Sequence, residues 1–275
     1  MAIPITPRSS CRAASLLAAT ALAACDAPSA AVELTAMQYN IAGIRDGQRG
    51  QAIVDAIAAA RPDLLSLQEC AGCEVLLAAL PGYAVAPIGT DDVALGYDAT
   101  RWDLREGGAF TLGGDDDGWG TRVTRWAHLV PRDGGGNGVY LYGTHWCVPI
   151  RSADDACDDR AHVGYAEATL ARVAARRHPD APAVLAGDLN VFDGEADGPA
   201  LRALRDGGLV DAVRTRDPRG DATSFHGNAW APPAALDYIL TTRDVEVLDA
   251  GVERTLTPGA GSDHDPVIAR LRVPG

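Results

Sequence analysis

The chain has 275 residues, 47% of them hydrophobic, and this size suits one globular domain with a sizeable core. Its 24 basic residues are all arginine and face 37 acidic residues, which gives a formal net charge of −13 at pH 7. Binding to duplex DNA normally begins with cationic contacts to phosphates, so this composition argues against a general DNA-binding protein.

The N-terminal segment has the pattern of an export signal. Arg8 and Arg12 precede an apolar run over residues 13–24, which is shorter than the roughly 20 residues of a membrane-spanning helix. The run ends in Leu22-Ala23-Ala24-Cys25, which resembles the lipobox of bacterial lipoproteins, where the chain is cut before an acylated cysteine. We therefore expect a signal peptide at residues 1–24, a short tether at 25–33 and a folded domain at 34–275.

This pattern also predicts where the protein resides. The expected product is a lipoprotein anchored to a membrane at the cell envelope through Cys25. The alternative is ordinary cleavage a few residues later, for example after Ala31, which would give a secreted or periplasmic protein. Removing residues 1–24 takes away two arginines and no acidic residue, so the net charge of −13 becomes −15.

Strand-like and helix-like segments alternate along the domain, which favours an α/β fold. The pattern predicts strands at residues 32–39, 63–68, 93–97, 123–130, 139–146, 182–187, 236–242, 245–252 and 266–273. It predicts helices at residues 50–60, at about 160–178 and at about 198–206. The glycine-rich segments at 112–120 and 134–136 are expected to be connectors.

Four cysteines lie in the domain: Cys70, Cys73, Cys147 and Cys157. Four cysteines can pair in three ways. An oxidising compartment favours disulfides, and the short separations favour the pairs Cys70–Cys73 and Cys147–Cys157. A redox or zinc site at Cys70-Ala71-Gly72-Cys73 is the alternative, although no second CxxC or spaced pair of histidines accompanies it.

Polar residues gather at the ends of the predicted strands, where the active sites of open α/β sheets lie. These residues are Asn40, Glu69, His145, Asp188, Asn190, Asp263 and His264. A single Asp or Asn at such a position is usually a cap or turn residue, whereas seven together favour a functional site.

The side chains of this set suit phosphoester hydrolysis, which needs a divalent cation, an activated water and donors for the developing charge. Carboxylate and amide oxygens are the ligands that hard cations such as Mg²⁺ or Ca²⁺ prefer. Histidines transfer protons near neutral pH or donate hydrogen bonds to phosphate, and a carboxylate such as Asp237 would fix a histidine's tautomer.

Six segments resemble, in order, the signatures of the DNase I-like endonuclease/exonuclease/phosphatase superfamily. They are Met37-Gln38-Tyr39-Asn40, Leu67-Gln68-Glu69, Gly143-Thr144-His145, Gly187-Asp188-Leu189-Asn190, Leu236-Asp237-Tyr238-Ile239-Leu240 and Gly261-Ser262-Asp263-His264-Asp265-Pro266. The similarity spans roughly residues 34–272, and Arg122 and Ser224-Phe225-His226-Gly227 also look like bacterial members. The resemblance implies a four-layered α/β sandwich: two mixed β-sheets face to face, with helices outside and the site at one rim.

The resemblance also implies a cation site and a substrate contact. Glu69 matches the principal ligand of Mg²⁺ (or Mn²⁺ or Ca²⁺), with Asn40 beside it and Asp263 as a further carboxylate near the metal. Arg122 and His226 would contact substrate, although His226 is equally read as a loop histidine satisfied by its neighbours.

The remaining matches imply catalytic roles. Asp188 and Asn190 would orient the attacking water and hold the phosphate, while His145 would bind the phosphoryl group or assist the leaving oxygen. His264 would be a second histidine, polarised by Asp237. Whether Asp188 or His264 takes the proton of the water stays open, and either Asp91 or Asp92 would support His145.

The predicted function is metal-dependent hydrolysis of a small or lipid-linked phosphodiester or phosphomonoester by in-line attack of an activated water. An extracellular endonuclease or exonuclease is the alternative, and a non-catalytic binding lipoprotein is a third possibility. Nucleic acid is possible but not favoured as a partner, because the chain has no cluster of arginines with interleaved aromatic residues. It also lacks the exposed aromatic hairpin of membrane-docking sphingomyelinase relatives, and no protein partner is evident.

Overall fold

The computed structural model describes residues 30–42, 47–70, 72–89, 92–114, 118–134, 136–149, 156–192, 198–229, 231–255 and 262–275. The predicted signal peptide and Cys25 lie outside these residues, as does Asp91. Among the helices that are described, none combines the length and the apolar character needed to cross a membrane.

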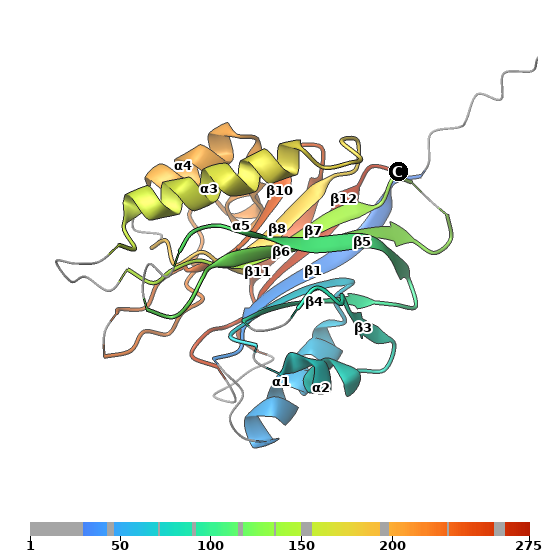
Figure 1. The fold of residues 1–275 in the computed structure, drawn as a ribbon. Coiled ribbons are helices and arrows are strands. Elements are labelled where there is room, and N and C mark those ends of the chain that lie inside the picture. Colours follow the sequence, from blue (N-terminus) through green and yellow to red (C-terminus); the bar gives the residue numbers. More distant parts are fainter. Residues whose placement is uncertain are drawn as a thin grey trace, which may run out of the picture.

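Two six-stranded sheets lie face to face, with helices on their outer sides (Figure 1). The first sheet has the strand order β11-β12-β1-β2-β4-β3. Its strands are β1 (Val32–Asn40), β2 (Leu64–Gln68), β3 (Tyr83–Val85), β4 (Val93–Asp98), β11 (Glu246–Val252) and β12 (Val267–Val273). The second sheet has the order β5-β6-β7-β8-β10-β9. Its strands are β5 (Trp102–Thr111), β6 (Val123–Pro131), β7 (Val139–His145), β8 (Ala183–Asp188), β9 (Leu209–Asp211) and β10 (Asp237–Thr242).

Both sheets are mixed, because β1 pairs with β2 and β7 pairs with β8 in parallel while the other pairs are antiparallel. Helices α1 (Gly47–Ala60) and α2 (Cys73–Ala78) lie on the first sheet, and α3 (Asp159–Ala174) and α4 (Pro199–Asp206) lie on the second (Figure 1). The short helix α5 (Ala212–Arg216) follows β9. The predicted four-layered α/β sandwich is therefore confirmed.

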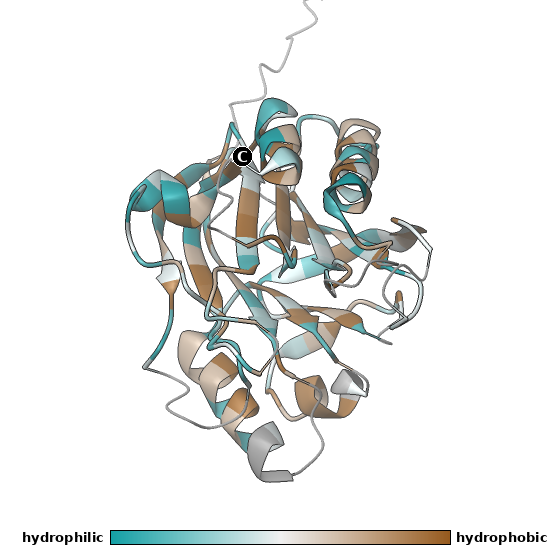
Figure 2. Ribbon diagram, turned by 90° about the vertical axis from the view of Figure 1, so that its left-hand side faces the viewer, coloured by the Kyte–Doolittle hydropathy of each residue, from teal (hydrophilic) through white to brown (hydrophobic). Residues whose placement is uncertain are grey.

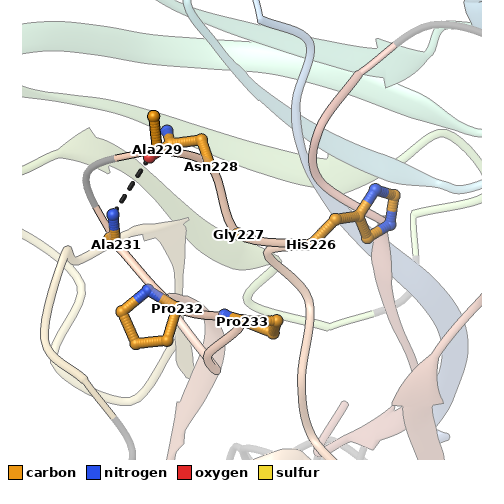
Figure 3. Close-up of a pocket in the computed structure, with 7 residues that line it drawn as sticks. All are labelled: His226, Gly227, Asn228, Ala229, Ala231, Pro232 and Pro233. Carbon is orange, nitrogen blue, oxygen red and sulfur yellow. Dashed lines mark hydrogen bonds between the residues drawn. The ribbon is translucent and has the colours of Figure 1, made fainter.

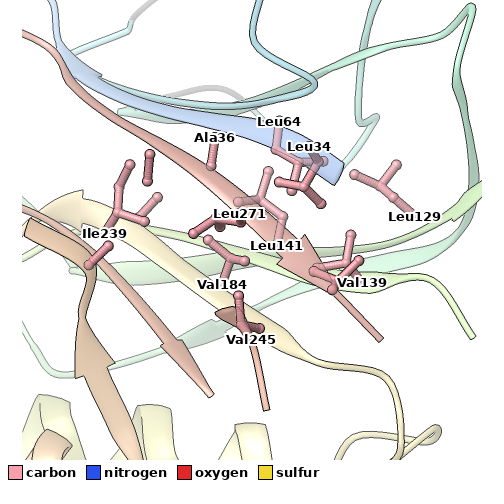
Figure 4. Close-up of a cluster of buried hydrophobic side chains, with 14 of the residues drawn as sticks. Leu34, Ala36, Leu64, Leu129, Val139, Leu141, Val184, Ile239, Val245 and Leu271 are labelled. Atoms are coloured by element: carbon pink, nitrogen blue, oxygen red, sulfur yellow. The ribbon is translucent and has the colours of Figure 1, made fainter. Parts of the chain in front are cut away.

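Three layers of buried hydrophobic side chains hold the four layers of structure together. The central layer lies between the sheets, where Leu34 and Leu271 of the first sheet meet Leu141 and Val184 of the second (Figure 4). A second layer joins β7 and β8 to α3 and α4, and a third joins β1 and β2 to α1 and α2. Hydrophobic stretches run along the strands of both sheets in Figure 2.

The strand ends follow from the sequence pattern, but the long predicted helix is shorter than expected. Helix α3 begins after the cap Asp158, whose side chain accepts hydrogen bonds from the next turn, and it ends at Ala174 instead of His178. The guanidinium of Arg176 bonds to the carbonyl oxygens of Val173 at 2.7 Å and Ala181 at 2.8 Å, and so turns the chain away from the helix axis.

Five elements were not predicted: α2, β3, β5, β9 and α5. Four of them are at most six residues long. Strand β5 has ten residues, but it is an edge strand with alternating exposure and two glycines, so it lacks a continuous apolar run.

Cys147 and Cys157 form a disulfide, as predicted, with their Cα atoms 5.9 Å apart. Cys70 is also disulfide-bonded, which argues against the alternative of a zinc site at this CxxC. The side chain of Cys73 lies outside what the structure describes, so the pairing Cys70–Cys73 stays a prediction.

Candidate active site

The candidate site lies at the rim where strands of both sheets end. Asn40 ends β1, Glu69 follows β2, and His145 and Asp188 end the parallel neighbours β7 and β8 in register with each other. The amide nitrogen of Asn40 donates to Asp188 Oδ2 at 3.0 Å, so the rims of the two sheets meet at this point.

A glycine in β7 allows this close approach of the sheets. A Cβ atom at Gly143 would lie 2.4 Å from Leu95 Cδ2 and 2.6 Å from Ser66 Oγ, both on the facing sheet. Any side chain here would push the sheets apart two residues before His145. The glycine of the Gly143-Thr144-His145 segment therefore serves packing, which in turn positions the histidine.

Asn40 bridges two carboxylates. Its Nδ2 donates to Glu69 Oε1 at 3.2 Å as well as to Asp188, and its Oδ1 accepts a hydrogen bond from the backbone N–H of Ala42 at 3.0 Å. The amide thus turns its donor toward the carboxylates, while its oxygen is held by the backbone. In this orientation Asn40 positions the two carboxylates, and its predicted role as a metal ligand stays a prediction.

Glu69 and Asn190 both have left-handed backbone conformations, with φ of 53° and 50°. Such conformations cost residues other than glycine about 1 kcal/mol or more and are often found at functional sites. The backbone N–H of Glu69 bonds to the Asp92 carboxylate, and its side chain is exposed at the rim. The side chain of Asn190 donates to the carbonyl oxygen of Trp146 at 3.0 Å.

His145 is buried and paired with a carboxylate on one side. Its Nδ1 lies 3.1 Å from both oxygens of Asp92, and its Nε2 lies 3.7 Å from Asp188 Oδ2. Burial alone would lower the pKa of His145, but the hydrogen bond and charge of Asp92, with the charge of Asp188, raise it above the ordinary value. Of the two candidates from the sequence, Asp92 is the one that the structure describes beside His145.

His264 repeats this arrangement on the other side of the site. Its Nδ1 lies 2.6 Å from Asp237 Oδ2, and its Nε2 lies 3.9 Å from Asp188 Oδ2. Burial acts to lower the pKa of His264, yet the charge and hydrogen bond of Asp237, with the charges of Asp188 and Asp263, raise it to about 10. These interactions favour the protonated form of His264.

Asp188 lies between the two histidines and is buried. Burial and then the charge of Asp237 raise its pKa, while His264, His145 and the hydrogen bond from Asn40 act in the opposite direction. Its other oxygen, Oδ1, accepts the backbone N–H of Asn190 at 2.9 Å. Both carboxylate oxygens are thus fixed in orientation.

Three buried polar residues that we did not predict hold Asp237 in place. Gln38 Nε2 donates to Asp237 Oδ1 at 2.5 Å and to the Gln68 side chain at 2.7 Å, and Ser224 Oγ donates to Asp237 Oδ2 at 2.6 Å. Gln38 and Gln68 are fully buried. A glutamine inside an apolar strand is the sequence signal that would have pointed to them, because buried polar groups need partners.

The rim beside His264 carries a pocket of about 390 Å³ that begins at His226 and extends to Pro233 (Figure 3). The backbone N–H of His226 donates to the Asp263 carbonyl at 2.8 Å, which links the pocket to the loop of His264. The His226 side chain is about half exposed and lies 3.0 Å from Asp265 Oδ2. It is thus satisfied by a neighbour and still accessible from the pocket.

Asp263 and Arg122 were predicted to lie near the metal and the substrate. Asp263 is exposed, and its charge helps to raise the pKa of the neighbouring His264. Its role as a metal ligand stays a prediction. Arg122 is 4% exposed and lies 3.4 Å from Asp92 Oδ2, the carboxylate that pairs with His145. Its contact with substrate stays a prediction.

The residues around Asn40 fit a hard divalent cation. Oxygens of Glu69 and Asp188 converge on the same amide nitrogen, and carboxylate oxygens are the ligands that Mg²⁺ prefers. Asp188, Asp237 and His264 also have potential ligand atoms within 4.8 Å of one another. In the group of Asp188, Asp237 and His264, however, Asp237 and the Nδ1 atom of His264 already bind each other. Among the carboxylates around Asn40, Glu69 is the one with an exposed side chain.

The comparison with protein families identifies the family of the chain. The profile of the endonuclease/exonuclease/phosphatase family matches residues 37–264, from just before Asn40 through His264. The chain belongs to the endonuclease/exonuclease/phosphatase family. This family consists in general of phosphoester hydrolases, which typically use a divalent metal. No curated protein matches the chain.

Solved structures of the endonuclease/exonuclease/phosphatase type share the fold. A family protein from Bacteroides thetaiotaomicron is 23% identical, with a TM-score of 0.70 over 89% of this chain and 99% of that one. A mannosyl-6-phosphatase from the same species has the same identity and TM-score over 86% and 99% of the two chains. The human Nocturnin catalytic domain with bound sulfate is 20% identical, with a TM-score of 0.68 over 87% and 94%.

Proposed function

We propose that this member of the endonuclease/exonuclease/phosphatase family hydrolyses small or lipid-linked phosphoesters with the help of a divalent cation. The observation that carries the proposal is the buried Asp188 carboxylate between two histidines, each backed by a carboxylate of its own. Such a set provides one acceptor for a proton and two imidazole donors for a phosphoryl group.

The directions of the pKa shifts support one division of the proton transfer. The pKa of His264 is raised to about 10, which favours a ring that holds its proton and donates a hydrogen bond. The pKa of His145 is raised as well. The two histidines are therefore proposed to donate to phosphoryl oxygens, and Asp188 to accept the proton of the attacking water. A cation held by Glu69 would polarise the phosphoryl group.

The surroundings of the site favour a small substrate. Apart from His226, the described residues that line the pocket next to His264 are small and uncharged, and His226 lies 3.0 Å from Asp265. A neutral group of modest size attached to the phosphate fits such a pocket better than a polyanion does. The structural neighbour named a mannosyl-6-phosphatase offers one example of a small phosphoester on this fold.

A panel assay tests the proposed activity. Purified protein is given Mg²⁺, Mn²⁺ or Ca²⁺ with a chromogenic phosphodiester, a phosphomonoester, sphingomyelin or plasmid DNA. We expect turnover of a small or lipid-linked ester, its loss in EDTA, and its recovery on adding the cation. Glu69→Gln should lower kcat/KM by at least about 100-fold without unfolding, because it removes a carboxylate charge at an exposed side chain.

Asp206→Asn is the matched control, because it removes an exposed carboxylate at the end of α4, in the outer helical layer. It should behave as the wild type in the same panel. Undiminished activity in EDTA, or in Glu69→Gln, would contradict a cation-dependent mechanism.

We further propose that the protein is attached to a membrane through a lipid on Cys25, with the catalytic domain beginning near residue 34. The lipobox-like sequence Leu22-Ala23-Ala24-Cys25 supports this proposal. Cys25→Ala should leave the protein unprocessed or release it from membranes, because acyl chains are strong apolar anchors. If the variant fractionates with membranes and is processed as the wild type is, the anchor is elsewhere.

A further inference from the structure

We propose that Glu106, His128 and His178 form a second metal site, which binds Zn²⁺ and is separate from the phosphoester site. The carboxylate and ring-nitrogen atoms through which these three residues would ligate all lie within 4.8 Å of one another. One carboxylate and two imidazoles are a ligand set that suits zinc, with the fourth position left to water.

The three residues come from separate parts of the chain and meet on the second sheet. Glu106 of β5 is paired directly with His128 of β6, and His178 lies beyond the end of α3. His128 is also paired with Tyr140 of β7, five residues before His145. At about 3.4 Å per residue this places the cluster roughly 17 Å along the sheet from the active-site rim.

His128 provides the strongest evidence, because it is 3% exposed and has a buried ring nitrogen without a partner. Its Nε2 lies 2.8 Å from the carbonyl oxygen of Asn137, so this nitrogen carries the hydrogen and donates it. The lone pair therefore belongs to Nδ1, which finds no hydrogen-bond partner among the described residues. Histidine ligands of metals commonly donate their other N–H to a backbone carbonyl in this way.

Burial and the hydrogen bond act on the same ring. Burial lowers the pKa of His128, and the charge of His178 acts in the same direction, whereas the Asn137 carbonyl and the charge of Glu106 raise it. A buried lone pair without a partner costs free energy, and a cation at Nδ1 would satisfy it.

The other two ligands lie near the His128 ring. Glu106 Oε1 accepts the hydroxyl of Tyr140 at 2.9 Å, while its Oε2 lies 4.0 Å from Arg177 Nη1, beyond hydrogen-bond distance. The rings of His128 and His178 are 4.9 Å apart between centroids. Arg176 supports the segment around His178 through the carbonyl oxygen of Pro179, at 2.5 Å.

The distances require a small closure on binding. Ligands of tetrahedral zinc at bond lengths of about 2.0–2.1 Å lie roughly 3.3 Å from one another. His178 is exposed, so its ring has the freedom to move toward the buried Nδ1 of His128. A bound ion would then join β5, β6 and the segment after α3, and would stabilise the native state by mass action.

The test is a zinc titration of the full, tag-free chain after removal of metals. Excess Mg²⁺ is present, and a chromogenic chelator competes for Zn²⁺. We expect one zinc equivalent that His178→Ala and Glu106→Gln each weaken by at least about 100-fold, more than the 10–100-fold typical of supporting residues. Zinc at 100 times its Kd should also raise the Tm of the wild type by about 5–10 °C, and not that of His178→Ala.

Two further variants separate this site from other zinc binding. Asp180→Ala removes an exposed carboxylate two residues from His178 and should keep the zinc equivalent. Glu69→Gln should keep it too, because it alters only the phosphoester site. The proposal is overturned if the wild type binds no zinc, or if His178→Ala binds the same number of ions with the same affinity.

Discussion

Asp188 has a histidine on each side, and each histidine has a second carboxylate behind it. The two pairs differ in their surroundings. Asp92 is partly exposed and also faces Arg122, whereas Asp237 is buried and held by Gln38 and Ser224. Asp237 is buried, so water cannot take its place as the partner that stabilises the charge of His264. We therefore expect Asp237 to act mainly through His264.

A double-mutant cycle tests this dependence. His264→Ala should lower kcat by about 100-fold or more, and Asp237→Asn by a smaller factor, since it removes the charge that keeps His264 protonated. The double variant should be within about threefold of His264→Ala alone, because without the imidazole the carboxylate has little left to orient. The measurement is kcat for the four proteins under saturating cation.

Asp92→Asn combined with His264→Ala is the matched control for this cycle. Asp92 acts on His145, on the other side of Asp188, so the penalties of this pair should multiply. If the penalties of Asp237→Asn and His264→Ala multiply in the same way, the two residues act independently and the proposed dependence is wrong.

At the level of elements, the sequence predicts those strands that consist of a continuous apolar run. Strands β2 and β8 are mainly apolar and buried on both faces, and their predicted ends agree within one residue. Strand β5 lies at an edge of its sheet and has no such run. Beyond the end of α3, the Arg176 side chain bonds to the nearby carbonyl oxygens of Val173 and Ala181. Neither an edge strand nor a side-chain bond to the backbone leaves a hydrophobic pattern in the sequence.

Asp211 offers a test at the start of α5. Its side chain caps the helix by accepting the N–H of Arg214 at 3.1 Å, and burial raises its pKa from 3.8 to about 6. For a carboxyl group with a raised pKa, the protonated form is favoured by folding. The contribution of Asp211 to the free energy of unfolding is therefore fully present below pH 3.8 and is lost as the pH rises through about 6.

Asp211→Asn should remove this loss and keep the cap, since Asn also caps helices well. We expect the free energy of unfolding to rise by about 1–2 kcal/mol at pH 7. A pKa unit corresponds to about 1.36 kcal/mol, and the expected gain is smaller than the full pKa shift would give because solvent screens a partly exposed residue. At pH 4 the gain should be close to zero. Urea denaturation at both pH values measures this gain, with the exposed Asp206→Asn as control. An equal gain at both pH values would show that the titration of Asp211 is not its cause.

At the scale of the whole molecule, the site exists only because two sheets meet. The motifs in the sequence identify Asn40, Asp188 and His264 individually, but they do not show that the Asn40 amide joins Glu69 to Asp188. They also leave open whether Asp188 or His264 is the base. The structure bears on that question because it shows the carboxylates that surround each histidine, and so the direction of each pKa shift.

The net charge of −13 leads to the last prediction, which concerns substrate class. A chain of this charge repels a polyanion at long range, so a small phosphodiester should be hydrolysed with a higher kcat/KM than plasmid DNA. An enzyme that relies on Z phosphate contacts loses affinity for DNA with a log–log salt slope of about −0.9Z, whereas hydrolysis of a small ester depends on a few local contacts. We therefore expect a shallow salt dependence for the small ester, measured as kcat/KM from about 50 to 200 mM salt.

Rapid plasmid nicking with steep inhibition by salt, together with poor turnover of the small ester, would favour a nuclease. In that case arginines near the rim, such as Arg254 beside Asp265, would form a local positive path that the net charge conceals.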